Sequence, residues 1–423
     1  MTALIGTLNK HGVAIAADSA ATIGNGRYDK VYNTANKIFA LSKVHPIGIM
    51  ICGNAEFKGV PWDIIIKSFR KKLGSKCFDT VKDYATNFVN FLKDNELPIH
   101  EFKTNTKEIN NFAVGVINAL LQNVLPPPKS GTMQINITEL IAKINKEVAS
   151  LPFQEDYKSL FVNFNKVISN TCTQFANKII GMPNLQNERE TLKTLFAKFI
   201  FAHFILKSSS ELVLTGYGEK EYFPYILSIQ IFQSVDSDWQ SVIRLSQGIT
   251  QQQTSLVCPF AQMDDMATLI SGIHPSVETA IKNSAGVILN SLKQDILKLA
   301  KGSDFENIIG EINVGSYVNT FIRQYQVSRD REYIAPLIAH IGQLEKEDLA
   351  MLAENLIGIT SLRKKVTMAT ESVGGPIDVA VISKHDGFIW MKRKLYFDNS
   401  LNPQFRENYY RDLNNTQSNS EIE

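Results

Sequence analysis

The sequence predicts an α+β protein, because its predicted strands and helices occur in separate groups and do not alternate along the chain. Hydrophobic residues make up 44% of the 423 residues and charged residues 20%, a composition typical of folded globular proteins. A chain of this length can bury a large core. We expect one domain that carries insertions, although length alone is equally compatible with about two or three smaller domains.

Four strands are expected before the first helix. Residues 3–8 and 13–17 are apolar runs joined by a turn at residues 9–12, which predicts a hairpin. Residues 37–41 and 47–52 form two further short apolar runs separated by a loop. The amino-terminal part is therefore expected to be β structure.

After these strands, apolar residues recur at helical spacing, and two further groups of strands are expected later in the chain. The expected helices are 55–73, 80–93, 135–149, 187–207, 260–273, 276–300 and 343–360. The expected later strands are 211–216, 225–232 and 241–245, and then 375–383 and 387–394 around an Asp-Gly turn. Residues 414–423 are polar and are expected to form a flexible tail.

Charge, cysteine and histidine patterns exclude several classes of function. A formal charge of +2 gives no reason to expect nucleic acid or a membrane as a partner, and no stretch approaches the length of a membrane span. Four separated cysteines without a CxxC pair fit a cytoplasmic protein, and the histidines show no metal-binding spacing. We therefore expect neither a metal nor another cofactor.

Thr2, directly after Met1, is the residue with the clearest chemical potential. Its side chain is small enough for methionine aminopeptidases to remove Met1, and no secretory leader is expected before it. A mature Thr2 would hold a hydroxyl nucleophile and an α-amine whose ordinary pKa is about 7.7–8.0. The amine could then act as the base for the hydroxyl of the same residue.

Several segments around Thr2 resemble the proteasome β-type family of N-terminal-nucleophile hydrolases, including its simpler bacterial relatives. The matching segments are residues 12–22 (GVAIAADSAAT), 37–39 (KIF), 48–55 (GIMICGNA), 373–379 (VGGPIDV) and 386–390 (DGFIW). The resemblance implies a four-layer α-β-β-α sandwich with inserted helical segments. It also implies a homo-oligomer that can form a ring, with an unfoldase or gating partner.

The resemblance further implies roles for particular residues. Thr2 is similar to the nucleophile, Lys37 to the lysine beside it and Asp18 to the carboxylate that pairs with this lysine. The backbone N–H groups of Cys52 and Gly53 correspond to the oxyanion hole, with the Cys52 side chain pointing away from the site. Substrate-binding positions are Ala21, Thr22, Phe39, Met50 and Asn54, and accessory positions are Glu371 and Ser372.

The domain organisation follows from the same resemblance. The expected core comprises residues 1–96, 186–273 and 333–400, and residues 97–185 and 274–332 are expected to be helical insertions. The whole chain, 1–423, would then be a single domain with these additions.

The expected function is that of a threonine-type amidohydrolase, with peptides or proteins as substrates. Two alternatives stay open. One is an enzyme of the same mechanism that cleaves a small amide, and the other is a catalytically inactive, proteasome-like scaffold.

Overall fold

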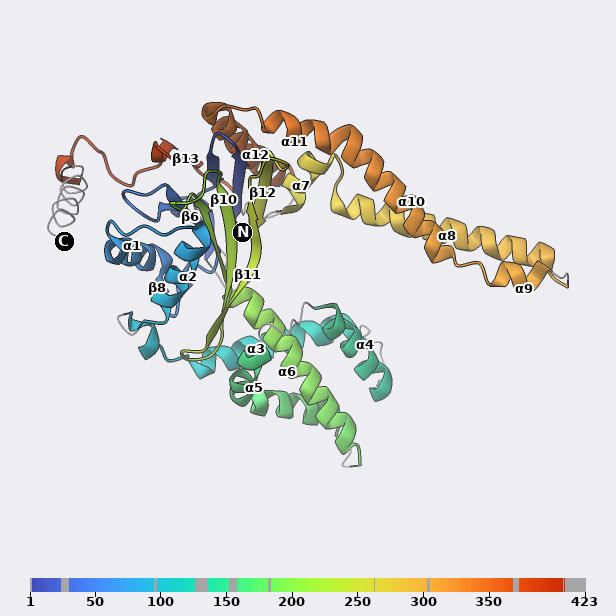
Figure 1. Ribbon diagram of the computed structural model, residues 1–423. Coiled ribbons are helices and arrows are strands. Elements are labelled where there is room, and N and C mark those ends of the chain that lie inside the picture. Colours follow the sequence, from blue (N-terminus) through green and yellow to red (C-terminus); the bar gives the residue numbers. More distant parts are fainter. Residues whose placement is uncertain are drawn as a thin grey trace.

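The computed structural model describes residues 2–23, 30–94, 97–125, 136–151, 158–181, 184–261, 263–302, 305–367, 373–405 and 407. It confirms the predicted α+β class, with antiparallel sheets and many helices. Figure 1 shows two groups of helices extending away from the sheets in different directions. The division of the chain into a core and two insertions remains a prediction.

The first sheet contains the amino-terminal strand in its interior. Its strand order is β12-β1-β2-β13-β14, and all four pairings are antiparallel. The strands are β1 (Ala3–Asn9), β2 (Val13–Ala17), β12 (Ser255–Ala261), β13 (Asp378–Ser383) and β14 (Gly387–Lys392). Ala17 pairs with Leu4 on one side and with Asp378 on the other, so three chain segments meet where β2 ends.

The second sheet has the order β11-β10-β9-β6-β5. Its strands are β5 (Ile38–Ala40), β6 (Ile47–Gly53), β9 (Ser210–Gly216), β10 (Tyr225–Gln233) and β11 (Trp239–Gly248). Two small hairpins accompany the sheets, β3 (Ala21–Ile23) with β4 (Lys30–Tyr32) and β7 (Glu56–Phe57) with β8 (Val60–Pro61).

Apolar side chains from both sheets share one buried cluster, which includes Leu4 and Ile15 of the first sheet and Met50 and Val213 of the second. The other face of the second sheet packs against α1 (Trp62–Leu73) and α2 (Val81–Leu92). The other face of the first sheet packs against α12 (Lys346–Val366), with contributions from α7 (Met263–Ser271) and α11 (Ala335–Ile341).

One group of helices has its own apolar core. It comprises α3 (Thr106–Val124), α4 (Ile137–Ser150), α5 (Lys158–Ile179) and α6 (Gln186–Ser208), and a 3-10 turn, η1 (Pro98–Glu101), precedes it. The carboxy-terminal end of α6 leads into β9, so this group is anchored to the second sheet (Figure 1).

The second group forms a long hairpin that we call the helical arm. It comprises α8 (Pro275–Ala300), α9 (Phe305–Gly310) and α10 (Val314–Arg329). A short π-helix, η3 (Asp330–Ile334), connects α10 with α11. Figure 1 shows α8 and α10 side by side, with α9 near the far end.

Two predicted helices begin later than expected. Residues 56–61 form the β7–β8 hairpin, because Lys58 and Gly59 adopt positive φ angles and Pro61 precedes the first helical residue. Residues 255–261 form strand β12, which the sequence analysis missed because Pro259 disfavours a strand. Proline is tolerated here since β12 lies at the edge of its sheet, where a strand needs hydrogen bonds on one side only.

Among the described helices, none combines the length and apolar character needed to cross a membrane.

Candidate functional site

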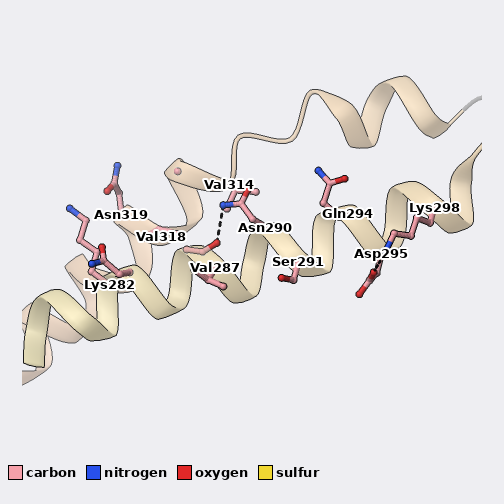
Figure 2. Close-up of a pocket in the computed structure, with 13 residues that line it drawn as sticks. Lys282, Val287, Asn290, Ser291, Gln294, Asp295, Lys298, Val314, Val318 and Asn319 are labelled. Carbon is pink, nitrogen blue, oxygen red and sulfur yellow. Dashed lines mark hydrogen bonds and ion pairs between the residues drawn. The ribbon is translucent and has the colours of Figure 1, made fainter. Parts of the chain in front are cut away.

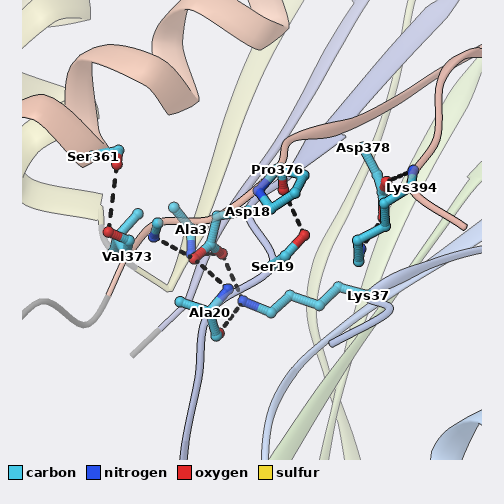
Figure 3. Close-up of polar contacts among 11 residues, drawn as sticks. Ala3, Asp18, Ser19, Ala20, Lys37, Ser361, Val373, Pro376, Asp378 and Lys394 are labelled. Atoms are coloured by element: carbon cyan, nitrogen blue, oxygen red, sulfur yellow. Dashed lines mark hydrogen bonds and ion pairs between the residues drawn. The ribbon is translucent and has the colours of Figure 1, made fainter. Parts of the chain in front are cut away.

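Asp18 lies at the centre of the candidate site, immediately after β2. Its Oδ1 accepts hydrogen bonds from Lys37 Nζ at 2.6 Å and from the Ala3 backbone N–H at 2.9 Å. Its Oδ2 accepts from the backbone N–H groups of Ala20 at 3.2 Å and Gly374 at 3.1 Å. The carboxylate thus ties together the start of β1, the end of β2, the segment before β13 and the residue before β5 (Figure 3).

Lys37 and Asp18 form a buried ion pair, with side chains 6% and 1% exposed. Lys37 Nζ also donates to the Ala20 carbonyl oxygen at 2.6 Å. Burial lowers the pKa of Lys37 below its ordinary value of 10.5, while Asp18 opposes that change by stabilising the charged form. The structure therefore brings two of the predicted catalytic residues into direct contact.

Thr2 lies next to this pair through the backbone. It is half-buried and directly precedes Ala3, whose N–H shares the Asp18 Oδ1 atom with Lys37. The amide nitrogen of Ala3 is bonded to the carbonyl carbon of Thr2, so the Thr2 main chain is held beside the lysine ammonium. Met1 is outside the described residues.

The end of β6 presents a backbone N–H toward the same region. Ile51 N–H donates to the Lys37 carbonyl oxygen at 2.9 Å, whereas Asn54 N–H donates to Ser209 on the opposite side at 2.9 Å. Because N–H directions alternate along a strand, the Gly53 N–H points to the Lys37 side and the Cys52 N–H points toward β9. Of the two predicted oxyanion donors, only Gly53 faces the β5 edge.

The Cys52 side chain, which was expected to point away from the site, reaches toward Glu211 of β9. It lies in the cluster between the two sheets, and its thiol is 3.5 Å from Glu211 Oε2. Burial, together with the nearby Glu211, raises the pKa of the thiol well above its ordinary value, and the Lys37 ammonium opposes this effect. The thiol therefore stays protonated near Lys37, which makes it a poor nucleophile.

The predicted substrate-binding residues do not all share one surface. Ala21 and Thr22 lie on β3, directly after Ala20, with Ala21 half-buried and Thr22 exposed. Phe39 packs with the cluster beneath α1 and α2, whereas Met50 is fully buried between the sheets. Phe39 and Met50 lie on opposite faces of the second sheet, so they cannot both line one substrate pocket, as their predicted substrate-binding role requires.

Two further predictions concern Asn54 and the accessory residues. The Asn54 N–H bonds to Ser209, and its carbonyl oxygen accepts from the Ser210 hydroxyl at 2.9 Å, so its main chain is engaged with β9. The accessory positions, Glu371 and Ser372, lie outside the described residues.

A second, partly buried ion pair near the site was missed by sequence reasoning. Lys394 Nζ pairs with Asp378, and the Lys394 N–H donates to the same carboxylate at 2.8 Å. Repulsion from Lys394 contributes to the lowered pKa of Lys37. Figure 3 shows this second pair on the far side of Ser19 and Pro376. No local sequence signal marks Lys394, because it follows the last strand and reaches Asp378 only through the fold.

Comparisons with known proteins give no family assignment. No protein-family model and no curated protein matches the sequence. Among solved structures, Anbu from Hyphomicrobium sp. strain MC1 is 10% identical, with a TM-score of 0.28 over 99% of this chain and 94% of that one. Anbu from Yersinia bercovieri, described as an ancestral beta-subunit, is 10% identical, with a TM-score of 0.24 over 98% of this chain and 96% of that one.

These findings correct the family assignment made from sequence motifs. No family model supports membership of the proteasome β-type family, and TM-scores of 0.24 and 0.28 are too low to show a common fold. The ring assembly and the unfoldase or gating partner are not tested by these comparisons, and they remain predictions.

Proposed function

We propose that the chain is an N-terminal threonine amidohydrolase that cleaves peptides or proteins in the cytoplasm after Met1 has been removed. One observation supports this proposal most strongly. The Asp18 Oδ1 atom accepts hydrogen bonds both from the Lys37 ammonium and from the backbone N–H of Ala3, the residue after Thr2. A buried cation is thereby fixed beside the residue whose hydroxyl would react.

The layers of the fold support this arrangement. The shared cluster between the two sheets, together with the helices on their outer faces, fits a helix–sheet–sheet–helix sandwich. In such a sandwich, Thr2 lies at the end of an interior strand of one sheet, and Gly53 lies at the end of a strand of the other.

The reaction begins when the Thr2 hydroxyl attacks a carbonyl carbon of the substrate. The free α-amine of Thr2 takes the hydroxyl proton and passes it to the leaving amine when the C–N bond breaks. Lys37 stabilises the negative charge that develops on the hydroxyl oxygen, and the Gly53 N–H binds the oxyanion. Water then hydrolyses the ester bond between Thr2 and the acyl group and releases the carboxylic acid.

Substrate binding is assigned to β3. Ala21 and Thr22 follow the Asp18–Ala20 segment directly, so an extended peptide paired along this short strand would place a carbonyl group near Thr2.

Replacement of Thr2 tests the proposal. Thr2→Ala should remove hydrolysis of a peptide library while preserving the removal of Met1, because alanine is also small. Thr2→Ser should retain measurable activity, since it keeps a hydroxyl beside the α-amine. Hydrolysis by Thr2→Ala at the wild-type rate would rule out the proposed nucleophile.

The same preparation distinguishes the alternatives. Intact mass shows whether Met1 has been removed, and retention of Met1 would favour an inactive scaffold. Cleavage of simple amides without cleavage of peptides would identify a small-amide hydrolase with the same nucleophile.

A further inference from the structure

The helical arm exposes far more apolar surface than a solvated hairpin requires. None of the described residues of α8 is buried, and Val318 is the one buried residue of α10. Helices of this kind gain most of their stability by packing an apolar face against another surface. The arm therefore has a face that lacks a protein partner within the described chain.

That face is a regular seam along α8. Ile281, Ala285, Ile288, Leu292 and Leu299 follow the alternating spacing of four and three residues that is typical of coiled coils. Asp295 occupies the remaining seam position and pairs with Lys298 at 2.9 Å. A single polar residue in such a seam is a recognised means of fixing the register of two helices.

The seam is highly exposed along its second half, from Ile288 onward, whereas Ile281 and Ala285 are half-buried. The exposed fractions are 65% for Ile288, 54% for Leu292 and 88% for Leu299, and the adjacent Ile296 is 38% exposed. The face of α8 that turns toward the rest of the arm carries Leu289, Lys293 and Leu297, all of which are less exposed. The seam therefore lies on the outward side of the hairpin.

A groove of about 960 Å³ between α8 and α10 borders the seam at Asp295 but contains none of its apolar residues. Figure 2 shows Val287 and Val318 in this groove together with the polar residues Asn290 and Gln294. Because α8 turns through about 100° per residue, Ile288, Leu292 and Leu299 lie on a different side of the helix. The seam is thus the more continuous apolar surface.

We propose that the seam binds the α8 seam of a second copy of this chain, so that two arms form a four-helix bundle. Equal and self-complementary surfaces are what a two-fold symmetric interface requires. The helix is roughly 39 Å long at about 1.5 Å per residue, and its seam residues expose on the order of 500 Å². With the flanking side chains, the contact approaches the roughly 800 Å² per partner of a specific interface.

The charges of the arm also favour a second copy. Basic and acidic residues are nearly balanced, so two arms do not repel one another, and the arm lacks the basic excess that an anionic membrane would attract. The basic residues of the arm are Lys282, Lys293, Lys298, Lys301, Arg323 and Arg329, and the acidic residues are Glu278, Asp295, Asp304, Glu306 and Glu311.

The test is the molar mass of the full-length protein by sedimentation velocity over a wide range of concentrations. Wild-type protein should associate beyond the 47.4 kDa of one chain, and Leu292→Glu should weaken this association by at least about tenfold. Val162→Glu on α5 is the matched control, because Val162 is 60% exposed and lies outside the arm. Circular dichroism should show equal helix content in all three proteins.

A second measurement identifies the interface directly. Leu292→Cys in a Cys77→Ser background should form a disulfide-linked dimer under mild oxidation, whereas Val162→Cys in the same background should not. A wild-type protein that stays a single chain at all concentrations would overturn the proposal. Association of Leu292→Glu equal to that of wild type, or the absence of the Leu292→Cys cross-link, would also overturn it.

Discussion

Asp18 is the residue on which the geometry of the site depends most strongly. Asp18→Asn replaces the carboxylate with an amide, so Lys37 loses its counter-charge within a buried environment. We expect the free energy of unfolding to fall by about 3–5 kcal/mol, the usual cost of breaking a buried ion pair by removing one partner. Urea denaturation measures this change.

The control for this prediction is Asp63→Asn, which breaks the exposed Lys67–Asp63 pair within α1. Its effect should be about 0.5 kcal/mol or less, because exposed pairs contribute little. Equal losses in the two variants would show that burial of the Asp18–Lys37 pair does not matter.

Lys37 and the Thr2 α-amine together determine the pH dependence of the proposed reaction. Activity should rise with pH as the Thr2 α-amine loses its proton, near its ordinary pKa of about 7.7–8.0. At higher pH the activity should fall again, because Lys37 loses its proton and the site loses the ammonium charge. Since burial lowers the pKa of Lys37, this fall should occur at a pH below the ordinary lysine value of 10.5. The dependence of kcat/KM on pH measures both limbs.

Lys394→Met tests the assignment of the alkaline limb. It removes a positive charge that disfavours the protonated form of Lys37, so the pKa of Lys37 should rise and the limb should move to higher pH. If the alkaline limb does not move, a group other than Lys37 must cause it.

At the scale of single elements, the end of β6 depends on the backbone conformation of Gly53. Its φ angle is +85°, and a Cβ atom added there would lie 2.5 Å from the Ser209 carbonyl oxygen. Gly53→Ala should therefore lower the free energy of unfolding by about 1–3 kcal/mol and displace the proposed oxyanion donor.

Gly115→Ala in the exposed part of α3 is the matched control. An added Cβ meets nothing within 4 Å there, and alanine favours the helix, so stability should rise by about 0.5–1 kcal/mol. Loss of stability in both variants would argue against a special strain at Gly53. Thermal unfolding compares the two directly.

The sequence predicted those elements whose signals are local. The first hairpin and strand β6 have strong apolar patterns, and both occur close to the expected bounds. Strand β12 was missed because its tolerance of Pro259 depends on its edge position, which only the sheet order reveals. The faces of Phe39 and Met50 likewise depend on which helices cover the second sheet.

In the candidate site, too, the sequence predicted only the contact that its motifs indicate. The pairing of Asp18 with Lys37 was expected from the motifs, and the structure places the two side chains in contact. The pair of Lys394 and Asp378, and the position of the Cys52 thiol beside Glu211, arise from segments far apart in the sequence. Contacts between segments so far apart leave no local pattern in a single sequence from which they could be predicted.

At the scale of the whole molecule, the two helical groups should differ in how their backbones open. α6 has nine buried residues, whereas α8 has none. In dilute protein, amides of α8 should therefore exchange hydrogen much faster than those of α6, because few buried contacts oppose local opening. If two arms pair through the α8 seam, raising the protein concentration should protect α8 and leave α6 unchanged, and Leu292→Glu should lose this protection. Hydrogen exchange read by mass spectrometry separates these outcomes, and an α8 that is as slow as α6 in dilute protein would contradict the prediction.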